Sequence, residues 1–139
     1  MRPIDLIVVH CSATPPTMDI GVKEIRTWHL KKNWDDIGYH FVIRRDGSIE
    51  KGRDIATQGA HAYPHNKHSI GICLVGGVDN AKLAEDNFSV EQYEMLKWLV
   101  RGLTSEYAGA RVCGHRDLPD VHKGCPSFDV AEYLRVLQN

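Results

Sequence analysis

The chain has 139 residues, the length of one ordinary domain, and its 42% hydrophobic and 25% charged residues are typical of a globular protein with a single core. Lysine and arginine total 17, and aspartate and glutamate total 18, so the formal net charge is -1. This balance gives no electrostatic case for nucleic acid or an anionic membrane as the main partner, although it leaves room for a local basic patch. We therefore expect one domain over residues 1–139, acting as a monomer with no direct nucleic-acid or membrane partner.

The first half of the chain predicts strands around one helix. Ile4–His10 carries apolar residues on both faces and is typical of a buried strand. Cys11–Gly21, with Ser, Thr, two Pro and Gly, predicts a loop, and the apolar periodicity of Val22–Asn33 predicts a helix. A second strand is expected over Tyr39–Arg44, followed by a turn and a short strand from Ile49.

The middle of the chain predicts a polar loop, a buried strand and the clearest helix. The loop covers Thr57–Ser69 and is rich in histidine, and the strand covers Ile70–Val75. The helix begins at Ser89, which forms a capping box with Gln92, and its apolar stripe continues to Tyr107.

The last third of the chain settles the expected fold class. Ala110–Cys113 predicts a short strand, residues 114–126 predict a loop, and Ser127 can cap a last helix that ends near Leu137. Strands and helices alternate along the whole chain. The predicted fold class is therefore α/β, with a central mixed β-sheet flanked by helices.

The N-terminus and the cysteines indicate a reducing compartment. Only Arg2 supplies an early positive charge, and the apolar run over residues 6–9 is too short for a signal core or a membrane span. We therefore expect a cytoplasmic protein with reduced thiols rather than a disulfide framework. Buried thiols are the simpler interpretation, and a metal ligand among them is the alternative. The four cysteines are Cys11, Cys73, Cys113 and Cys125.

Three residues that can bind a metal stand next to predicted strands and helices. His10 closes the first strand, His115 follows the last strand, and Cys125 precedes the last helix. Two imidazoles and one thiolate suit Zn²⁺ and leave a fourth position open for water. From pattern alone, each of them is more often a surface or core residue than a ligand.

Five blocks of the sequence carry a resemblance to a known family. They are Val9–Thr14, Gly38–Phe41, Ser69–Gly77, Gly114–Asp117 and Lys123–Asp129. In this order they closely resemble the zinc amidases of the peptidoglycan-recognition superfamily, which include the small amidases of T-odd phages. The similarity extends from about Leu6 to the last helix, and five blocks in order are far more specific than any one of them.

The resemblance implies a ligand set and an activity. It implies that His10, His115 and Cys125 bind Zn²⁺ and that Tyr39 and Lys123 are catalytic. The activity is hydrolysis of the amide bond between N-acetylmuramoyl and L-alanine in peptidoglycan. The implied protein is a phage or prophage endolysin that stays in the host cytoplasm until release or pore formation. Lys123 would stabilise the oxyanion, and Tyr39 would donate a hydrogen bond to it or orient the water.

Pattern alone offers a second interpretation of several residues. Tyr39 would share a strand face with Phe41 as a core aromatic, and Lys123 would be a solvated loop lysine. The histidine-rich segment 59–68 either lines the substrate groove or is a solvated loop. Trp28 and Trp34 can stack on a sugar, although core packing is favoured for Trp28.

The sequence says less about the roles of the residues around the predicted ligands. Asp117 or Asp129 can orient a ligand imidazole, as metal-bound histidines usually require. No glutamate presents itself as the proton carrier for the leaving amine. Strand alternation points Cys11 to the face opposite its histidine neighbour. Cys113 is interpreted as a packing residue and Cys73 as a core residue.

Three alternative functions compete with the amidase. The first is a module that recognises peptidoglycan without cutting it, which typically has a broken metal set. The second is a regulator that binds phage RNA polymerase, as one phage amidase of this kind does. Two departures argue against it: the first strand begins almost at Met1, and residues 118–122 resemble an insertion. The third is a zinc hydrolase that acts on another amide.

Overall fold

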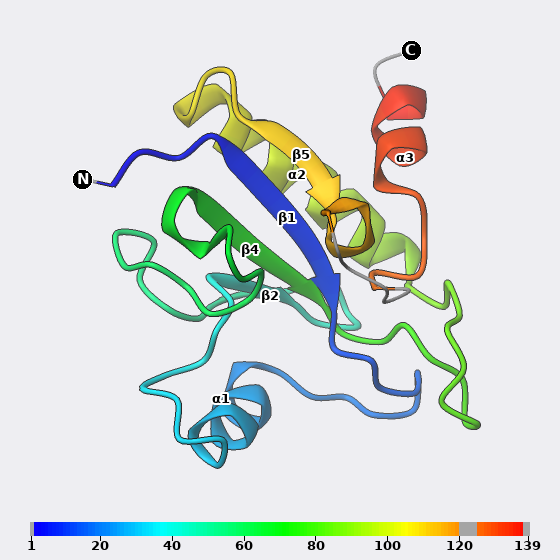
Figure 1. Cartoon of the computed structure of the whole chain (residues 1–139). Coiled ribbons are helices and arrows are strands. Elements are labelled where there is room, and N and C mark those ends of the chain that lie inside the picture. The colour runs from blue at the N-terminus through cyan, green and yellow to red at the C-terminus, as the bar shows by residue number, and fades with distance from the viewer. Residues whose placement is uncertain (1, 120–124, 138–139) are drawn as a thin grey trace.

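The computed structural model describes residues 2–119 and 125–137, which form one central sheet with helices on both faces (Figure 1). The strands are β1 (Leu6–Cys11), β2 (Phe41–Ile43), β3 (Ile49–Lys51), β4 (Ser69–Leu74) and β5 (Arg111–Gly114). The helices are α1 (Val22–Leu30), α2 (Val90–Glu106) and α3 (Val130–Leu137), with short 3-10 helices η1 (Asn66–His68) and η2 (His115–Asp117). Within the described ranges, no helix is both long and apolar enough to cross a bilayer.

The sheet is mixed and has the strand order β3-β2-β4-β1-β5. β1 lies between β4 and β5 and is parallel to both, β2 is parallel to β4, and β3 is antiparallel to β2. Every residue of β1 is buried, as expected for a strand with parallel neighbours and covered faces. The predicted α/β class with a mixed sheet is confirmed.

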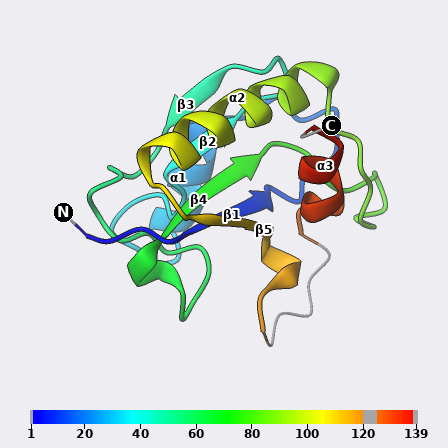
Figure 2. The ribbon, with the colours of Figure 1, turned by 90° about the horizontal axis from the view of Figure 1, so that it is seen from above.

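Alternate residues of β1 face two different layers. Ile7 belongs to the apolar cluster that contains Leu96 of α2 and Val130 of α3, so these helices cover one face of the sheet. The other face is covered in part by α1, where Ile25 packs in a cluster with Val42 of β2. Figure 2 shows α2 lying across the strands, with α3 beside its first turns.

The segment 59–68 covers the rest of the α1 face. Ala62 packs in a small cluster with Leu6 and Val8, whose side chains alternate with those that face α2. His10 continues this alternation and therefore belongs to the face that α1 and the 59–68 segment share. The fold thus places the first candidate ligand between two covering segments that come from separate parts of the chain.

Two predicted helix boundaries are wrong. The first helix ends at Leu30 rather than Asn33, because Asn33 adopts a left-handed conformation with φ 66°. Ser127 does not cap the last helix: its hydroxyl donates to the Gly77 carbonyl at 2.7 Å, and its φ is 76°. Asp129 takes the capping role, since its carboxylate accepts the Glu132 N–H at 3.1 Å.

The predicted capping box of the long helix is confirmed. The Ser89 hydroxyl accepts the Gln92 N–H at 3.1 Å, and the Gln92 side chain accepts the Ser89 N–H at 2.9 Å. Gln92 is fully buried, and its amide nitrogen also donates to the carbonyls of Ile43 and Val75, at 3.1 and 2.9 Å. This one side chain therefore ties the start of α2 to the ends of β2 and β4.

Candidate active site and metal centre

Two histidines meet at the edge of the sheet where β1 and β5 end. His10 is the penultimate residue of β1 and is buried. β5 runs parallel to β1 with Gly114 opposite Val9, so His115, which follows β5, is carried to the position beside His10. The two ring centroids are 4.5 Å apart. Parallel pairing therefore brings together two imidazoles that are far apart in the sequence.

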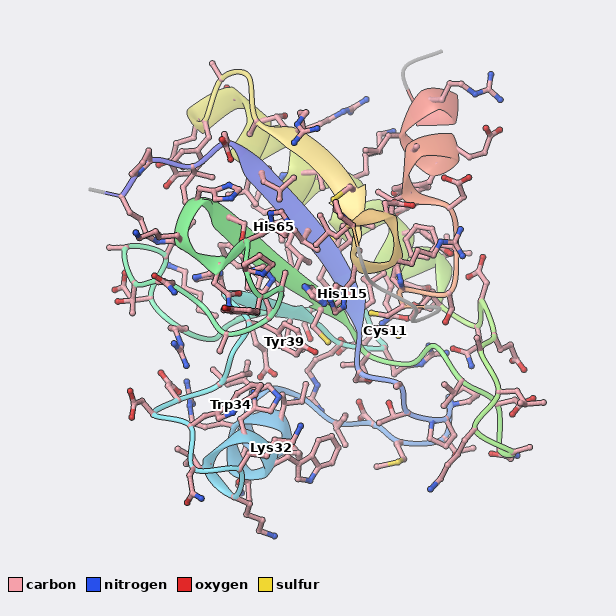
Figure 3. All side chains as sticks on the ribbon, viewed as in Figure 1. Cys11, Lys32, Trp34, Tyr39, His65 and His115 are labelled. Atoms are coloured by element: carbon pink, nitrogen blue, oxygen red, sulfur yellow. The ribbon has the colours of Figure 1, made fainter. Side chains whose placement is uncertain are left out.

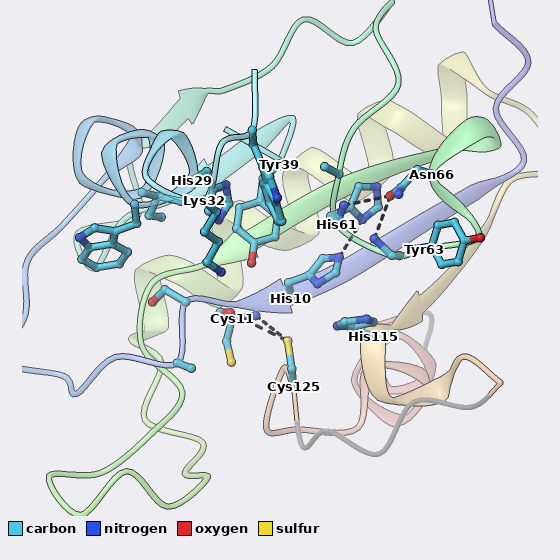
Figure 4. A pocket seen from close by; sticks show the side chains of 17 residues that line it. His10, Cys11, His29, Lys32, Tyr39, His61, Tyr63, Asn66, His115 and Cys125 are labelled. Atoms are coloured by element: carbon cyan, nitrogen blue, oxygen red, sulfur yellow. Dashed lines mark hydrogen bonds between the residues drawn. The ribbon is translucent and has the colours of Figure 1, made fainter. Parts of the chain in front are cut away.

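Cys125 lies next to both histidines. Its Sγ accepts the Cys11 N–H at 3.0 Å, a contact drawn in Figure 4. The candidate ligand atoms of His10, His115 and Cys125 all lie within 4.8 Å of one another. Usual zinc bond lengths in a tetrahedron separate such atoms by about 3.4–3.6 Å, so small side-chain movements suffice for coordination. Two nitrogens and one sulfur are donors that zinc prefers, and the residues therefore fit that ion.

The environment of Cys125 suits a thiolate once a cation is bound. Without a cation, contact with the Cys11 thiol and burial raise the pKa of Cys125. A coordinating thiol is deprotonated outright, so a divalent cation reverses this direction. The Cys11 N–H then donates to an anion, which strengthens the hydrogen bond. The Cys11 thiol itself lies against Gly77, where an added Cβ would be 2.6 Å from Sγ.

Tyr39 is half-buried and faces the same site. It precedes β2, and its ring centroid lies 5.1 Å from that of His10 and 5.6 Å from that of His29. His29 accepts the Gly38 N–H at 2.9 Å, which fixes the chain just before Tyr39. Burial and three neighbouring thiols raise the pKa of Tyr39, so the phenol keeps its proton at neutral pH. Figure 4 shows its hydroxyl directed toward β1, where it can act as a donor.

An open pocket of about 720 Å³ lies over these residues. On one side it is lined by α1 and the turn after it, with Trp28 and Trp34 keeping 37% and 36% of their surface exposed. The Lys32 ammonium lies 5.3 Å from the Trp34 ring centroid. Figure 3 shows Lys32 and Trp34 on the α1 side of Tyr39. Trp28, for which core packing was expected, is a pocket residue instead.

The 59–68 segment lines the other end of the pocket. Ala60, His61, Ala62, Tyr63 and Asn66 contribute to the wall, and Tyr63 is 89% exposed. In Figure 4 this end lies beyond His10, on the side away from α1. Of the two interpretations of this segment, the structure favours the one in which it lines the groove.

His61 is a site residue to which the sequence assigned no individual role. Its Nδ1 lies 2.8 Å from His10 Nε2, and its Nε2 lies 3.1 Å from the Ser69 hydroxyl. Burial lowers the pKa of His61 to about 3, so the ring is neutral. Its only sequence signal is membership of a histidine-rich segment, which does not distinguish it from His65 or His68.

The remaining predicted residues have other surroundings. Lys123 lies outside the described residues. Asp117, the last residue of η2, accepts the N–H of Gly114 just before that helix at 2.8 Å, and Asp129 caps α3, so both carboxylates bond backbone N–H groups. Cys113 packs beside the cluster of Leu6, Val8 and Ala62, and Cys73 is fully buried in the core under α1. All four cysteines are free thiols.

The fold and the site together define a class of protein. A small α/β protein holds a candidate metal centre of two histidines and one cysteine at the end of its sheet, at the floor of an open groove. This is the arrangement of a metal-assisted hydrolase. Comparison with known families gives the particular member of that class. Residues 1–128 match the family described as N-acetylmuramoyl-L-alanine amidase, and the chain belongs to that family.

Individual relatives agree with this assignment. The chain is 48% identical over 127 residues to the endolysin of Klebsiella phage KP32, covering 91% of this chain and 83% of the relative. It is 46% identical over 129 residues to the endolysin of Escherichia phage T7, covering 93% and 84%. A solved structure of the amidase LysC from Clostridium intestinale superposes with a TM-score of 0.82 at 28% identity, covering 99% of this chain and 87% of that one. The resemblance seen in the sequence is confirmed.

Proposed function

We propose that this chain, an N-acetylmuramoyl-L-alanine amidase, cleaves the bond between N-acetylmuramoyl and L-alanine in peptidoglycan with a zinc ion held by His10, His115 and Cys125. The observation that carries the proposal is the convergence of their ligand atoms within 4.8 Å at the floor of the pocket. Zinc in such a site polarises the scissile carbonyl and supplies a hydroxide nucleophile at neutral pH.

Tyr39 is the residue best placed to act on the reacting carbonyl. Its ring packs beside His10, and its raised pKa keeps the hydroxyl protonated. A protonated phenol can donate a hydrogen bond to the oxygen that gains negative charge when the amide is attacked. A fixed donor of this kind acts more strongly in the transition state than on the neutral substrate, which is how it raises the rate.

The groove matches a substrate that continues on both sides of the scissile bond. The candidate metal centre and Tyr39 lie between the α1 end, with Trp28 and Trp34, and the end formed by the 59–68 segment, with Tyr63. N-acetylmuramoyl in peptidoglycan carries a glycan strand on one side and a peptide on the other. Exposed aromatic faces at both ends suit the stacking of sugar rings and apolar peptide groups.

Two competing functions are a non-catalytic peptidoglycan-recognition module and a regulator that binds phage RNA polymerase. A non-catalytic recognition module would not need a complete ligand set, whereas the set of two histidines and one cysteine is intact and carries Tyr39 beside it. Binding to phage RNA polymerase stays an untested alternative, and the monomeric state stays a prediction. We further propose that residues 1–139 form one amidase domain that accumulates in the host cytoplasm and reaches the wall after release or pore formation.

The test combines metal content with product identity. Purified protein should contain close to one zinc per chain by elemental analysis, and mass spectrometry of digested peptidoglycan should show peptides that begin with a free L-Ala amino group. Cys125→Ser should lose zinc and activity together. Cys113→Ser, a half-buried thiol outside the ligand set, is the matched control and should retain both. Cut glycan strands with intact peptides, or full activity in Cys125→Ser, would refute the proposal.

A further inference from the structure

His61 contacts the candidate ligand His10 directly. The 2.8 Å separation of His61 Nδ1 and His10 Nε2 is a hydrogen bond, and the 3.1 Å separation of His61 Nε2 and Ser69 Oγ is a second one. The two rings are nearly perpendicular, at 84°, with centroids 4.9 Å apart. A chain of hydrogen bonds therefore runs from the metal centre through His61 to the first residue of β4.

The position of the His61 ring is fixed from several sides. The Asn66 side chain accepts the backbone N–H groups of His61 and Ala62, at 2.9 and 2.8 Å, which holds the segment in place. The ring lies over Gly71 of β4, where an added Cβ would be 2.6 Å from the ring Cγ. Ser69 is fully buried. This is a prepared site for one imidazole, because a larger residue at 71 would displace the ring.

The direction of the hydrogen bonds follows from the chemistry of metal ligands. A histidine binds a metal through an unprotonated nitrogen, and a hydrogen bond from its other N–H fixes which nitrogen that is. Since His10 Nε2 contacts His61, a metal-binding His10 carries its proton on Nε2 and presents Nδ1 to the metal. His61 then accepts at Nδ1, carries its own proton on Nε2 and donates it to Ser69.

We propose that His61 is a positioning residue of the metal centre, which holds the His10 imidazole in the Nε2–H tautomer and in the orientation that leaves Nδ1 for zinc. The proposal rests on the zinc-dependent function proposed above. Partners of this kind typically change metal affinity by about 10- to 100-fold when they are removed.

The test measures zinc affinity and the tautomer itself. Zinc Kd is measured by competition with a chelator of known affinity for the wild type, His61→Ala, His61→Asn and His68→Asn. His61→Ala should bind zinc about 10- to 100-fold more weakly. His61→Asn, whose amide can reach the place of Nδ1, should recover part of the loss. His68→Asn, whose ring contacts Asp5 at the surface, is the matched control and should equal the wild type.

A second measurement does not depend on any variant folding. In the zinc-bound wild type labelled with ¹⁵N, long-range ¹H–¹⁵N spectra report which nitrogen of His10 carries the proton, and Nε2 is expected. A proton on Nδ1, or a zinc Kd of His61→Ala within twofold of the wild type, overturns the proposal. So does a raised KM with unchanged zinc affinity, which would make His61 a substrate contact. A wild type that binds no zinc overturns the proposed function itself, whereas the other outcomes leave it standing.

Discussion

Replacing Tyr39 with phenylalanine removes one hydroxyl and little else. The ring keeps its packing 5.1 Å from the His10 ring and 5.6 Å from the His29 ring, so we expect the fold and zinc content to stay unchanged. What is lost is one hydrogen bond to the developing oxyanion. A single donor of this kind is worth about 100- to 1000-fold in kcat, or about 2.7–4 kcal/mol.

The assay follows the release of L-Ala amino termini from purified peptidoglycan under saturating substrate. We expect kcat of Tyr39→Phe to fall by about 100- to 1000-fold with a small change in KM, since the lost interaction is made in the transition state. Because the raised pKa of Tyr39 keeps the phenol protonated, the reduction should be the same between about pH 6 and 9. A kcat within about fivefold of the wild type, with zinc retained, would refute the assigned role.

Three further predictions concern the supporting structure. Gly71→Ala places a Cβ 2.6 Å from the His61 ring and should lower the free energy of unfolding, measured in urea, by about 1–3 kcal/mol. Gly102→Ala, whose Cβ would have nothing within 4 Å, is the control and should be neutral or stabilising. Equal effects of the two substitutions would contradict the crowding argument. Gln92→Ala should cost about 2–4 kcal/mol, because it removes two hydrogen bonds to buried carbonyls and half of a capping box. The Ile43 carbonyl then keeps only the Val75 N–H and the Val75 carbonyl only the Arg45 guanidinium, and a loss below about 1 kcal/mol would disprove this. Burial lowers the pKa of His40 to about 4, against about 6.5 for an unfolded histidine. The unfolded state therefore binds more protons between these values, and the metal-free protein should lose stability as pH falls from about 6.5 to 4; His40→Asn should weaken this pH dependence, and an unchanged profile would show that His40 does not cause it.

The sheet was predictable because its signals are local. β1 carries apolar residues on both faces, which is the pattern of a strand with parallel neighbours. Ser89 and Gln92 form a capping box, a signal within four residues that predicts where α2 begins. The errors at helix ends have local causes that composition does not reveal. Asn33 and Ser127 both adopt positive φ values, and the Ser127 hydroxyl bonds a carbonyl fifty residues away.

The site was predictable only in part. Pattern alone names His10, His115 and Cys125 as possible ligands among eight histidines and four cysteines, and the ordered sequence blocks select them. The role of His61 was not predicted, because this residue lies in an irregular segment whose path depends on contacts with residues further along the chain. Its place is set by Asn66 five residues on and by Gly71 in the next strand, and neither contact has a periodic signature in the sequence.

The candidate ligands come from opposite ends of the chain, with residue 10 in the first strand and residue 125 just before the last helix. An ion bound by both would act as a removable cross-link that closes nearly the whole polypeptide into one loop. Its binding energy would count toward global folding, because the unfolded chain has no such cage. Chelation would then weaken the entire sheet, and a polypeptide cut short before residue 125 would have no complete cage to load.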